Sequence, residues 1–425
     1  MRRAPGGKRR GSFGARPTYY TDISAMILSR RHFLFGSLAL PTLAAAKSTG
    51  DRPNILLILV DGLPSWMLGC YGGKEVRTPN IDQLYATGVR FRNHFAASPS
   101  AGPGRASLLT GRTALQLGGG ESIPSAEISL AKILGGLGYG CLAADTGASD
   151  AVAAQTMKFF DERAAGQPFF LTAGFTDLLP PYEGVAQKYR DMYAQAQFES
   201  CFPSEPPASN ARVGKEMLPD LLGSLRKVAA AVTALDDRVG SLVTRLRQRQ
   251  LLDHTLIVFT STSGSLYGRH GLWDSGEASA PVNMYEETVS TPMIWRWPVR
   301  LPPQTNRPES VSACDFVPTL CELTGATPPN RNLSGRSYLT VAMGKPLPQK
   351  QPWRNVVFSH LQDTDMVRDS RFKLVLRNGG KGPNEFYDLQ TDPRERTNGY
   401  DDGQYASIRP ALAAEIAKWK QRYSS

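Results

Sequence analysis

Asn54-Ile55-Leu56-Leu57-Ile58-Leu59-Val60-Asp61-Gly62 joins six consecutive aliphatic residues to an acidic residue and a glycine. A continuous apolar run of this length, without polar alternation, indicates a β-strand that is buried on both faces. Strands of this kind belong to parallel sheets that helices cover on both sides. Ligands of such sheets bind beyond the carboxyl ends of the strands, so a functional site is expected near Asp61.

Apolar runs and helical periods alternate along the chain as far as about residue 330. Further buried strands are expected at 168–175, 255–260 and 293–297. Helices are expected from Pro79, with Thr78 as the N-cap residue, and over 129–137 and 222–248. The alternation predicts an α/β domain in residues 51–330, with a mostly parallel central sheet flanked by helices.

After about residue 330 the pattern changes to short alternating segments. Strands are expected at 355–359, 365–368 and 372–376, and a helix at 408–423. Short alternating strands joined by turns favour antiparallel pairing. We therefore expect a smaller antiparallel α+β subdomain in residues 331–425.

The N-terminus has the features of an export signal. Ser29-Arg30-Arg31-His32-Phe33-Leu34 resembles the twin-arginine motif, an apolar run follows at 33–43, and Ala44-Ala45-Ala46 offers a cleavage site. We expect a signal peptide at 26–46, a possible disordered extension at 1–25, and a periplasmic or secreted mature protein without a membrane span. A buried helix with a chance arginine pair is the alternative, and the start at Met1 or Met26 stays open.

The positive charge is concentrated at the N-terminus. The formal net charge is +11, and residues 1–50 carry +8 of it. The remaining +3 is spread over a long chain, which does not indicate a basic nucleic-acid surface. Nucleic acid is therefore not expected as a partner.

The stretch from Ser100 to Gly111, with Pro103, Arg105, a small-apolar run and Thr110-Gly111, resembles the sulfatase signature Cys-x-Pro-Ser-Arg. Further landmarks run in family order from Arg52 to about Asn398. They include 53–55, 78–82, 234–240, 268–273, 315–320 and 385–389. The chain is thus similar to sulfatases of the alkaline-phosphatase-like superfamily. The resemblance implies that fold and the hydrolysis of sulfuric esters.

The nucleophile position of that signature is altered. Ala101 stands where the family has the Cys or Ser that is oxidised to formylglycine, and Gly104 replaces the Ser. A methyl side chain cannot be oxidised to an aldehyde, hydrated, or made to attack sulfur. The family reaction is therefore not expected at Ala101.

The resemblance also implies a Ca²⁺ site, and most of its ligands are replaced. Asp61 matches the first carboxylate, but Gly62 replaces the second, and Thr262 and Ser263 stand at the later Asp-Asn pair. Ca²⁺ prefers several oxygen ligands with negative charge. No cofactor is therefore expected, and at most weak Ca²⁺ binding.

Basic residues that hold sulfate in the family are replaced as well. Residues 145–148 stand at its Gly-Lys-Trp-His, Leu179 stands at a later His, and Ser275 or Pro281 stands at a later Lys. Arg105 and His270 survive. Arg105 contacts the nucleophile in active relatives, with a structural ion pair to Asp61 as the alternative. His270 is expected in a structural or substrate-side role.

Replacement hydroxyls are available, but no base or metal is evident near them. They are Ser98, Ser100, Ser107, Thr110 and Ser261. Hydroxyl nucleophiles require such activation, so helix capping and turn bonding are the favoured roles. Our main hypothesis is a non-catalytic sulfatase homologue that binds an anionic or sulfated glycan. The alternatives are a sulfate or phosphate ester hydrolase with a rearranged site and a purely structural envelope protein.

Overall fold

Strand β1 (Asn54–Val60) lies inside a seven-stranded sheet of the computed structural model, in the order β3-β4-β1-β5-β6-β2-β7. The other strands are β2 (Val89–Phe95), β3 (Gly140–Ala144), β4 (Phe169–Phe175), β5 (Thr255–Ser261), β6 (Met293–Arg296) and β7 (Thr305–Ser312). β6 runs antiparallel to both its neighbours, and the other pairs are parallel. The predicted, mostly parallel sheet is confirmed.

The structure describes residues 52–424 except 146, 183, 200–204 and 348–351. The extension expected at 1–25 and the signal peptide expected at 26–46 lie outside the described residues. No helix in the described part is long and apolar enough to cross a membrane.

Side chains of β1 point alternately into two hydrophobic cores. Leu56, Ile58 and Val60 belong to one cluster, and Ile55, Leu57 and Leu59 to the other. Successive side chains of a strand face opposite sides of the sheet. The uninterrupted apolar run therefore reflects burial on both faces, as expected.

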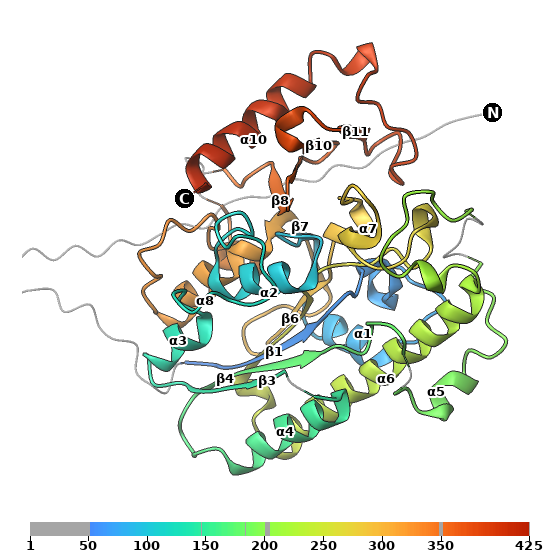
Figure 1. Ribbon diagram of the computed structural model, residues 1–425. Helices are drawn as coiled ribbons and strands as arrows, with labels where there is room; N and C mark the ends of the chain where they lie inside the picture. The colour runs from blue at the N-terminus through green and yellow to red at the C-terminus, as the bar shows by residue number, and fades with distance from the viewer. Residues whose placement is uncertain (1–51, 146, 183, 200–204, 348–351, 425) are drawn as a thin grey trace, which may run out of the picture. The chain divides into compact units, whose positions relative to one another are not determined.

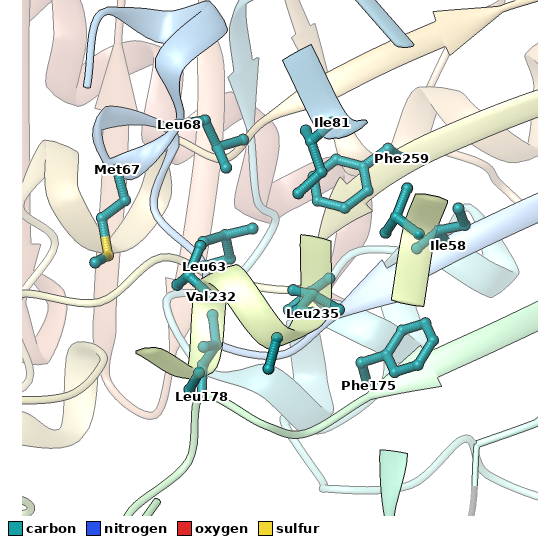
Figure 2. Close-up of a cluster of buried hydrophobic side chains, with 14 of the residues drawn as sticks. Ile58, Leu63, Met67, Leu68, Ile81, Phe175, Leu178, Val232, Leu235 and Phe259 are labelled. Atoms are coloured by element: carbon teal, nitrogen blue, oxygen red, sulfur yellow. The ribbon is translucent and has the colours of Figure 1, made fainter. Parts of the chain in front are cut away.

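Helices cover both faces of the sheet (Figure 1). The first core packs against α1 (Pro79–Ala86), α4 (Ser149–Glu162) and α6 (Leu221–Gln248), and the second against α2 (Ala101–Thr110), α3 (Leu130–Gly135), α8 (Phe316–Thr324) and α9 (Leu339–Ala342). Figure 2 shows Val232 and Leu235 of α6 facing Ile58, Phe175 and Phe259 of the strands. Short helices α5 (Gln187–Asp191) and α7 (Glu286–Val289) lie in the connections.

The first turn of α1 is capped differently from the expectation. Thr78 is the N-cap residue, but its side chain makes no capping hydrogen bond. Instead Asp236 of α6 accepts hydrogen bonds from the backbone N–H groups of Asn80 and Ile81, at 3.0 and 2.8 Å. A carboxylate from a distant helix thus satisfies the free N–H groups of α1.

A second sheet has the antiparallel order β11-β10-β9-β8. Its strands are β8 (Val357–Leu361), β9 (Thr364–Arg368), β10 (Phe372–Arg377) and β11 (Glu385–Asp388). Helix α10 (Arg409–Tyr423) packs on it, with Trp419 stacked on Phe358 at a ring-centroid distance of 5.1 Å. The predicted small antiparallel α+β element near the C-terminus is confirmed.

Candidate functional site

The candidate site lies at the carboxyl ends of β1 and β5, which pair in parallel. Asp61 follows β1, Thr262 and Ser263 follow β5, and the backbone N–H of Thr262 donates to the carbonyl of Val60 at 2.9 Å. Helix α2 begins at Ala101, a short connection after β2. The sheet thus brings the first carboxylate position and the later hydroxyl pair together, because parallel strands end at the same edge.

Asp61 is bound by two side chains of the protein. Arg105 Nη2 lies 3.0 and 3.1 Å from its carboxylate oxygens, and Thr262 Oγ1 donates to Oδ1 at 2.8 Å. Side-chain exposure is only 19% for Arg105 and 10% for Asp61. Arg105 Nη1 also lies 3.4 Å from Asp145. The negative charge of Asp61 is therefore compensated within the protein, in the ion pair that sequence reasoning held as an alternative.

Two carboxylates that sequence reasoning missed border the first turn of α2, and we call this region the head of α2. Ser100 donates its hydroxyl to Glu277 Oε2 at 2.9 Å. Glu121 packs against Gly102 so closely that a Cβ atom there would lie 2.6 Å from the Glu121 Cα. Partial burial, then the charges of Glu277 and Asp61, raise the pKa of Glu121. The charges of Glu277 and Asp61 therefore reach Glu121, which lies beside the first turn of α2.

The backbone lies close against the altered signature. A Cβ atom at Gly104 would overlap the carbonyl oxygen of Thr262. Gly62 has φ +74°, a left-handed conformation that side chains other than glycine adopt at a cost. A Ser in place of Gly104 therefore does not fit without movement of the chain, whereas a side chain at position 62 would find space but a strained backbone conformation.

His270 has its own partners, away from Asp61 and Arg105. Its ring stacks on Tyr285 at a centroid distance of 3.7 Å, and its Nε2 lies 3.5 Å from Glu287 Oε2. Burial opposes ionisation of Glu287, but the contacts with His270 and Arg269 outweigh it and lower the pKa of Glu287 to about 2. This geometry suits the structural role that sequence reasoning favoured.

Three of the five hydroxyls that could replace the nucleophile donate hydrogen bonds to other groups of the protein. Thr110 donates to the carbonyl of Ala106 at 2.7 Å, and Ser261 to that of Val60 at 2.8 Å. Ser98 and Ser107 are buried and find no hydrogen-bond partner among the described residues. The expectation that no base lies near these hydroxyls is wrong for Ser100, because the fold brings Glu277 to it from a distant turn.

Positions of the family's sulfate-holding bases carry no positive charge. Asp145 contacts Arg105, Ala148 is the N-cap residue of α4, and Leu179 is 40% exposed. Pro281 shares with Glu277 the lining of a cavity of about 430 Å³. An anion at the head of α2 would meet carboxylates, because Arg105 is already paired.

A Ca²⁺ ion does not fit the donor set at Asp61. Ca²⁺ takes six to eight oxygen ligands, usually with several carboxylates. Here Arg105 and Thr262 already occupy Asp61. Within the described part of the chain, no three His, Cys, Asp or Glu side chains are arranged to hold a metal ion. The side chains around Asp61 are therefore arranged as an ion pair and not as a cation site.

The sequence of the chain matches two known protein families. The sequence matches the family described as Sulfatase over residues 53–145 and 140–326, which is more than half of the chain. The chain belongs to the sulfatase family. Residues 268–422 also match the family described as N-sulphoglucosamine sulphohydrolase, C-terminal.

The individual relatives of this sulfatase-family protein have low sequence identity to it, but the alignments cover most of both chains. It is 23% identical to an N-acetylglucosamine-6-O-sulfatase of Bacteroides thetaiotaomicron, over 95% of this chain and 93% of the relative. It is 26% identical to human arylsulfatase A, over 84% and 85% of the two chains.

Solved structures share the fold. A protein in complex with its substrate D-glucosamine-2-N,6-O-disulfate gives a TM-score of 0.75 at 20% identity, over 88% of this chain and 98% of that chain. A phosphonate monoester hydrolase of Agrobacterium radiobacter gives 0.73 at 20% identity, over 88% and 96%. The alkaline-phosphatase-like architecture is therefore common to all three.

Proposed function

We propose that this sulfatase-family protein is an exported homologue that does not hydrolyse sulfuric esters and instead binds an anionic or sulfated saccharide. The observation that carries the proposal is Ala101 as first residue of α2, bordered by Glu277 and Glu121. A nucleophilic mechanism needs an activated hydroxyl, thiol or aldehyde hydrate at that position. The methyl group of Ala101 supplies none of these.

Charge at the head of α2 also opposes the family reaction. Catalysis of ester hydrolysis depends on positive groups placed where negative charge develops. Arg105 is the cation nearest to Asp61 among the described contacts, and it is held by Asp61 and Asp145. Glu121 and Glu277 add negative charge beside the position of a sulfate ester. The transition state would therefore be destabilised here.

The ligand class is inferred from the relatives. One is named an N-acetylglucosamine-6-O-sulfatase, and another was solved with its substrate D-glucosamine-2-N,6-O-disulfate. A homologue that loses catalysis but keeps the fold can retain recognition of a similar saccharide. We therefore propose sulfated amino sugars as the first ligands to test.

A second candidate function rests on the contact between Ser100 and Glu277. A hydroxyl 2.9 Å from a carboxylate has the geometry of a nucleophile with its general base. A hydrolase built on this pair would use Ser100 in place of the missing formylglycine. The negative surroundings and the 3% exposure of Ser100 disfavour an anionic ester as its substrate.

Hydrolysis assays test the first proposal against the second. Purified protein is incubated with aryl sulfate and aryl phosphate esters and with Ca²⁺, Mg²⁺ or Mn²⁺. We expect no turnover by the wild type or by Ala101→Cys, and no stoichiometric divalent metal by elemental analysis. Metal-dependent turnover that Asp61→Asn abolishes would overturn the non-catalytic proposal.

Matched variants identify the second function if turnover is found. A Ser100–Glu277 hydrolase would lose its activity in both Ser100→Ala and Glu277→Gln. Ser107→Ala removes a buried hydroxyl from the same helix and should keep that activity. Equal activity in all three variants would exclude Ser100 as the nucleophile.

Export is proposed from the twin-arginine motif at Arg30 and Arg31. Cell fractionation checks it. The wild type is expected in the periplasm or medium, and a variant with both arginines changed to lysine in the cytoplasm. Equal distribution of the two proteins would contradict export by this route.

A further inference from the structure

A second pocket, lined mostly by residues after Ser312 but also by Ala97 and Thr113 on either side of α2, carries the opposite charge balance. It has a volume of about 320 Å³ and is lined by α10, by residues just before and in β8, and by the segment before α9. We call it the α10 pocket. Its charged lining residues are Arg336, Arg354, Glu415, Lys418 and Arg422. Four cations thus face one carboxylate within the lining.

Two of the four cations are neutralised by neighbours. Lys418 Nζ lies 2.8 Å from Glu415 Oε1 on the same helix. Arg354 is paired with Asp315, which is fully buried behind the lining. These two pairs leave Arg336 and Arg422 to set the charge of the pocket, which is therefore about +2.

Arg336 and Arg422 have no carboxylate partner among the described contacts. Arg336 stacks over Trp353 at 4.0 Å and donates from Nη2 to the carbonyl of Pro352 at 3.0 Å, while its buried Nε finds no partner among the described residues. Arg422 lies over the ring of Tyr423 at 5.5 Å and is exposed. Burial and the like charge of Arg354 lower the pKa of Arg336. An anion in the pocket would relieve that repulsion.

The cationic groups are held in place by the fold. Asp315 accepts from the backbone N–H of Ser312 and of Arg336, both at 2.8 Å, and pairs with Arg354. Gly335 approaches the chain so closely that a Cβ atom there would lie 2.7 Å from the backbone nitrogen of Asp315. Arg336 and Arg354 are therefore positioned before any ligand arrives, which lowers the entropy cost of binding.

The chemistry of the lining suits an oxyanion attached to a sugar. Planar guanidinium groups match the oxygen atoms of sulfate or phosphate. The volume lies near the lower end of small-ligand pockets, roughly 300–1,000 Å³. Trp419 and Tyr423 add apolar surface beside the charges. Resting on the proposed binding function, we propose that the α10 pocket binds the sulfo or phospho group of an anionic saccharide.

Ligand-induced thermal shifts and calorimetry test this proposal on the mature chain. The probes are D-glucosamine 6-sulfate, D-glucosamine-2-N,6-O-disulfate, glucose 6-phosphate, inorganic sulfate and, as an uncharged control, N-acetylglucosamine. A ligand that binds the native state raises the melting temperature. We expect a rise with the charged sugars and none with N-acetylglucosamine. The sulfated and phosphorylated sugars distinguish the two sources of the oxyanion.

Variants locate the binding site. Arg422→Gln is expected to weaken binding roughly tenfold or more, since charge-assisted hydrogen bonds are strong. Arg247→Gln is the matched control, because Arg247 is also an exposed arginine in the last turn of a helix. It should leave the affinity unchanged. Ala101→Asp adds negative charge at the head of α2 and should also leave it unchanged.

Each outcome supports or overturns the proposal. Loss of affinity in Arg422→Gln alone supports the α10 pocket. Loss in Ala101→Asp with normal binding by Arg422→Gln would overturn the pocket, but saccharide binding, which is the proposed function, would stand with its site beside Ala101. No melting shift with any charged sugar would overturn both.

Discussion

The head of α2 and the α10 pocket both gather charged side chains, but they use charge differently. At the head of α2, Arg105 forms ion pairs with Asp61 and Asp145. Glu121 and Glu277 lie beside them and leave an excess of negative charge. In the α10 pocket, Asp315 and Glu415 are outnumbered by cations. Ionic groups at the head of α2 therefore serve the fold, whereas those in the pocket retain capacity for a ligand.

The difference shows how a site can lose its chemistry without loss of the fold. Charges that a ligand or metal would neutralise must find partners inside the protein, because unpaired buried charge is costly. Arg105 and Thr262 supply such partners for Asp61. Substitutions at the head of α2 should therefore change mainly the stability of the protein, whereas substitutions in the α10 pocket should change mainly the binding of a ligand.

Removal of Asp61 should have the largest effect on stability. Asp61→Ala leaves Arg105 mostly buried with only the longer contact to Asp145, so we expect a loss of about 4 kcal/mol in unfolding free energy. Denaturant unfolding measures it. Asp145→Ala, whose side chain is 30% exposed, should cost about 1 kcal/mol or less. Equal losses would show that Asp61 is not the main partner of Arg105.

Acidification should test whether His270 belongs to the scaffold. The pKa of Glu287 is about 2 in the folded protein against an ordinary value of 4.5. The unfolded chain therefore takes up this proton first as the pH falls, so stability present above pH 4.5 is lost toward pH 2, by about 3 kcal/mol. The free energy of unfolding is measured across this pH range. In Glu287→Gln it should no longer show the pH-dependent loss that the Glu287 carboxylate causes in the wild type. An unchanged pH profile would contradict the assigned contact.

Restoring the serine of the signature should destabilise the head of α2. Gly104→Ser forces a side chain into the carbonyl of Thr262, and we expect a cost of about 2 kcal/mol without any gain in sulfatase activity. Gly120→Ser is the control, because a Cβ atom at Gly120 meets nothing within 4 Å. Thermal unfolding compares the two. A neutral Gly104→Ser would mean that the backbone opens easily at this position.

The smallest change in stability is expected in the α10 pocket. Arg422 is exposed, so Arg422→Gln should alter the unfolding free energy by no more than about 0.5 kcal/mol. Ligand binding by the wild type should weaken several-fold between about 0.1 and 1 M NaCl, because salt screens exposed charges. Calorimetry at both salt concentrations checks this. A large stability loss in Arg422→Gln would assign the arginine to the scaffold.

Much of the fold followed from periodicity. The apolar runs that form β1, β4, β5 and β6 were recognised because strands buried on both faces lack polar residues. β2, β3 and β7 were not predicted. β2 and β7 carry charged or polar side chains, β3 is short and half exposed, and β3 and β7 are the edge strands. Their pairing depends on distant partners, which local patterns do not contain.

The site was predictable only in part. Motif order placed Asp61, Ala101, Arg105 and Thr262 in one region, and the structure brings these segments together. Glu121 and Glu277 gave no sequence signal, because Glu121 lies in an irregular segment, Glu277 lies in a single 3-10 turn (Gly276–Ala278), and neither segment carries a motif. Their position beside α2 follows from the folding of loops.

The reactions that Ala101 and Gly62 exclude can be read from the residue types alone, because a methyl group or a hydrogen atom has fixed chemistry wherever it lies. The sequence also determined the two-sided burial of β1 through an unbroken apolar run. The fold brings Glu277 to Ser100 and places Arg336, Arg354 and Arg422 around one pocket. Local patterns do not contain these contacts, because the packing of distant elements sets which charges are neighbours. Those neighbours decide whether a charged group serves the fold or a ligand.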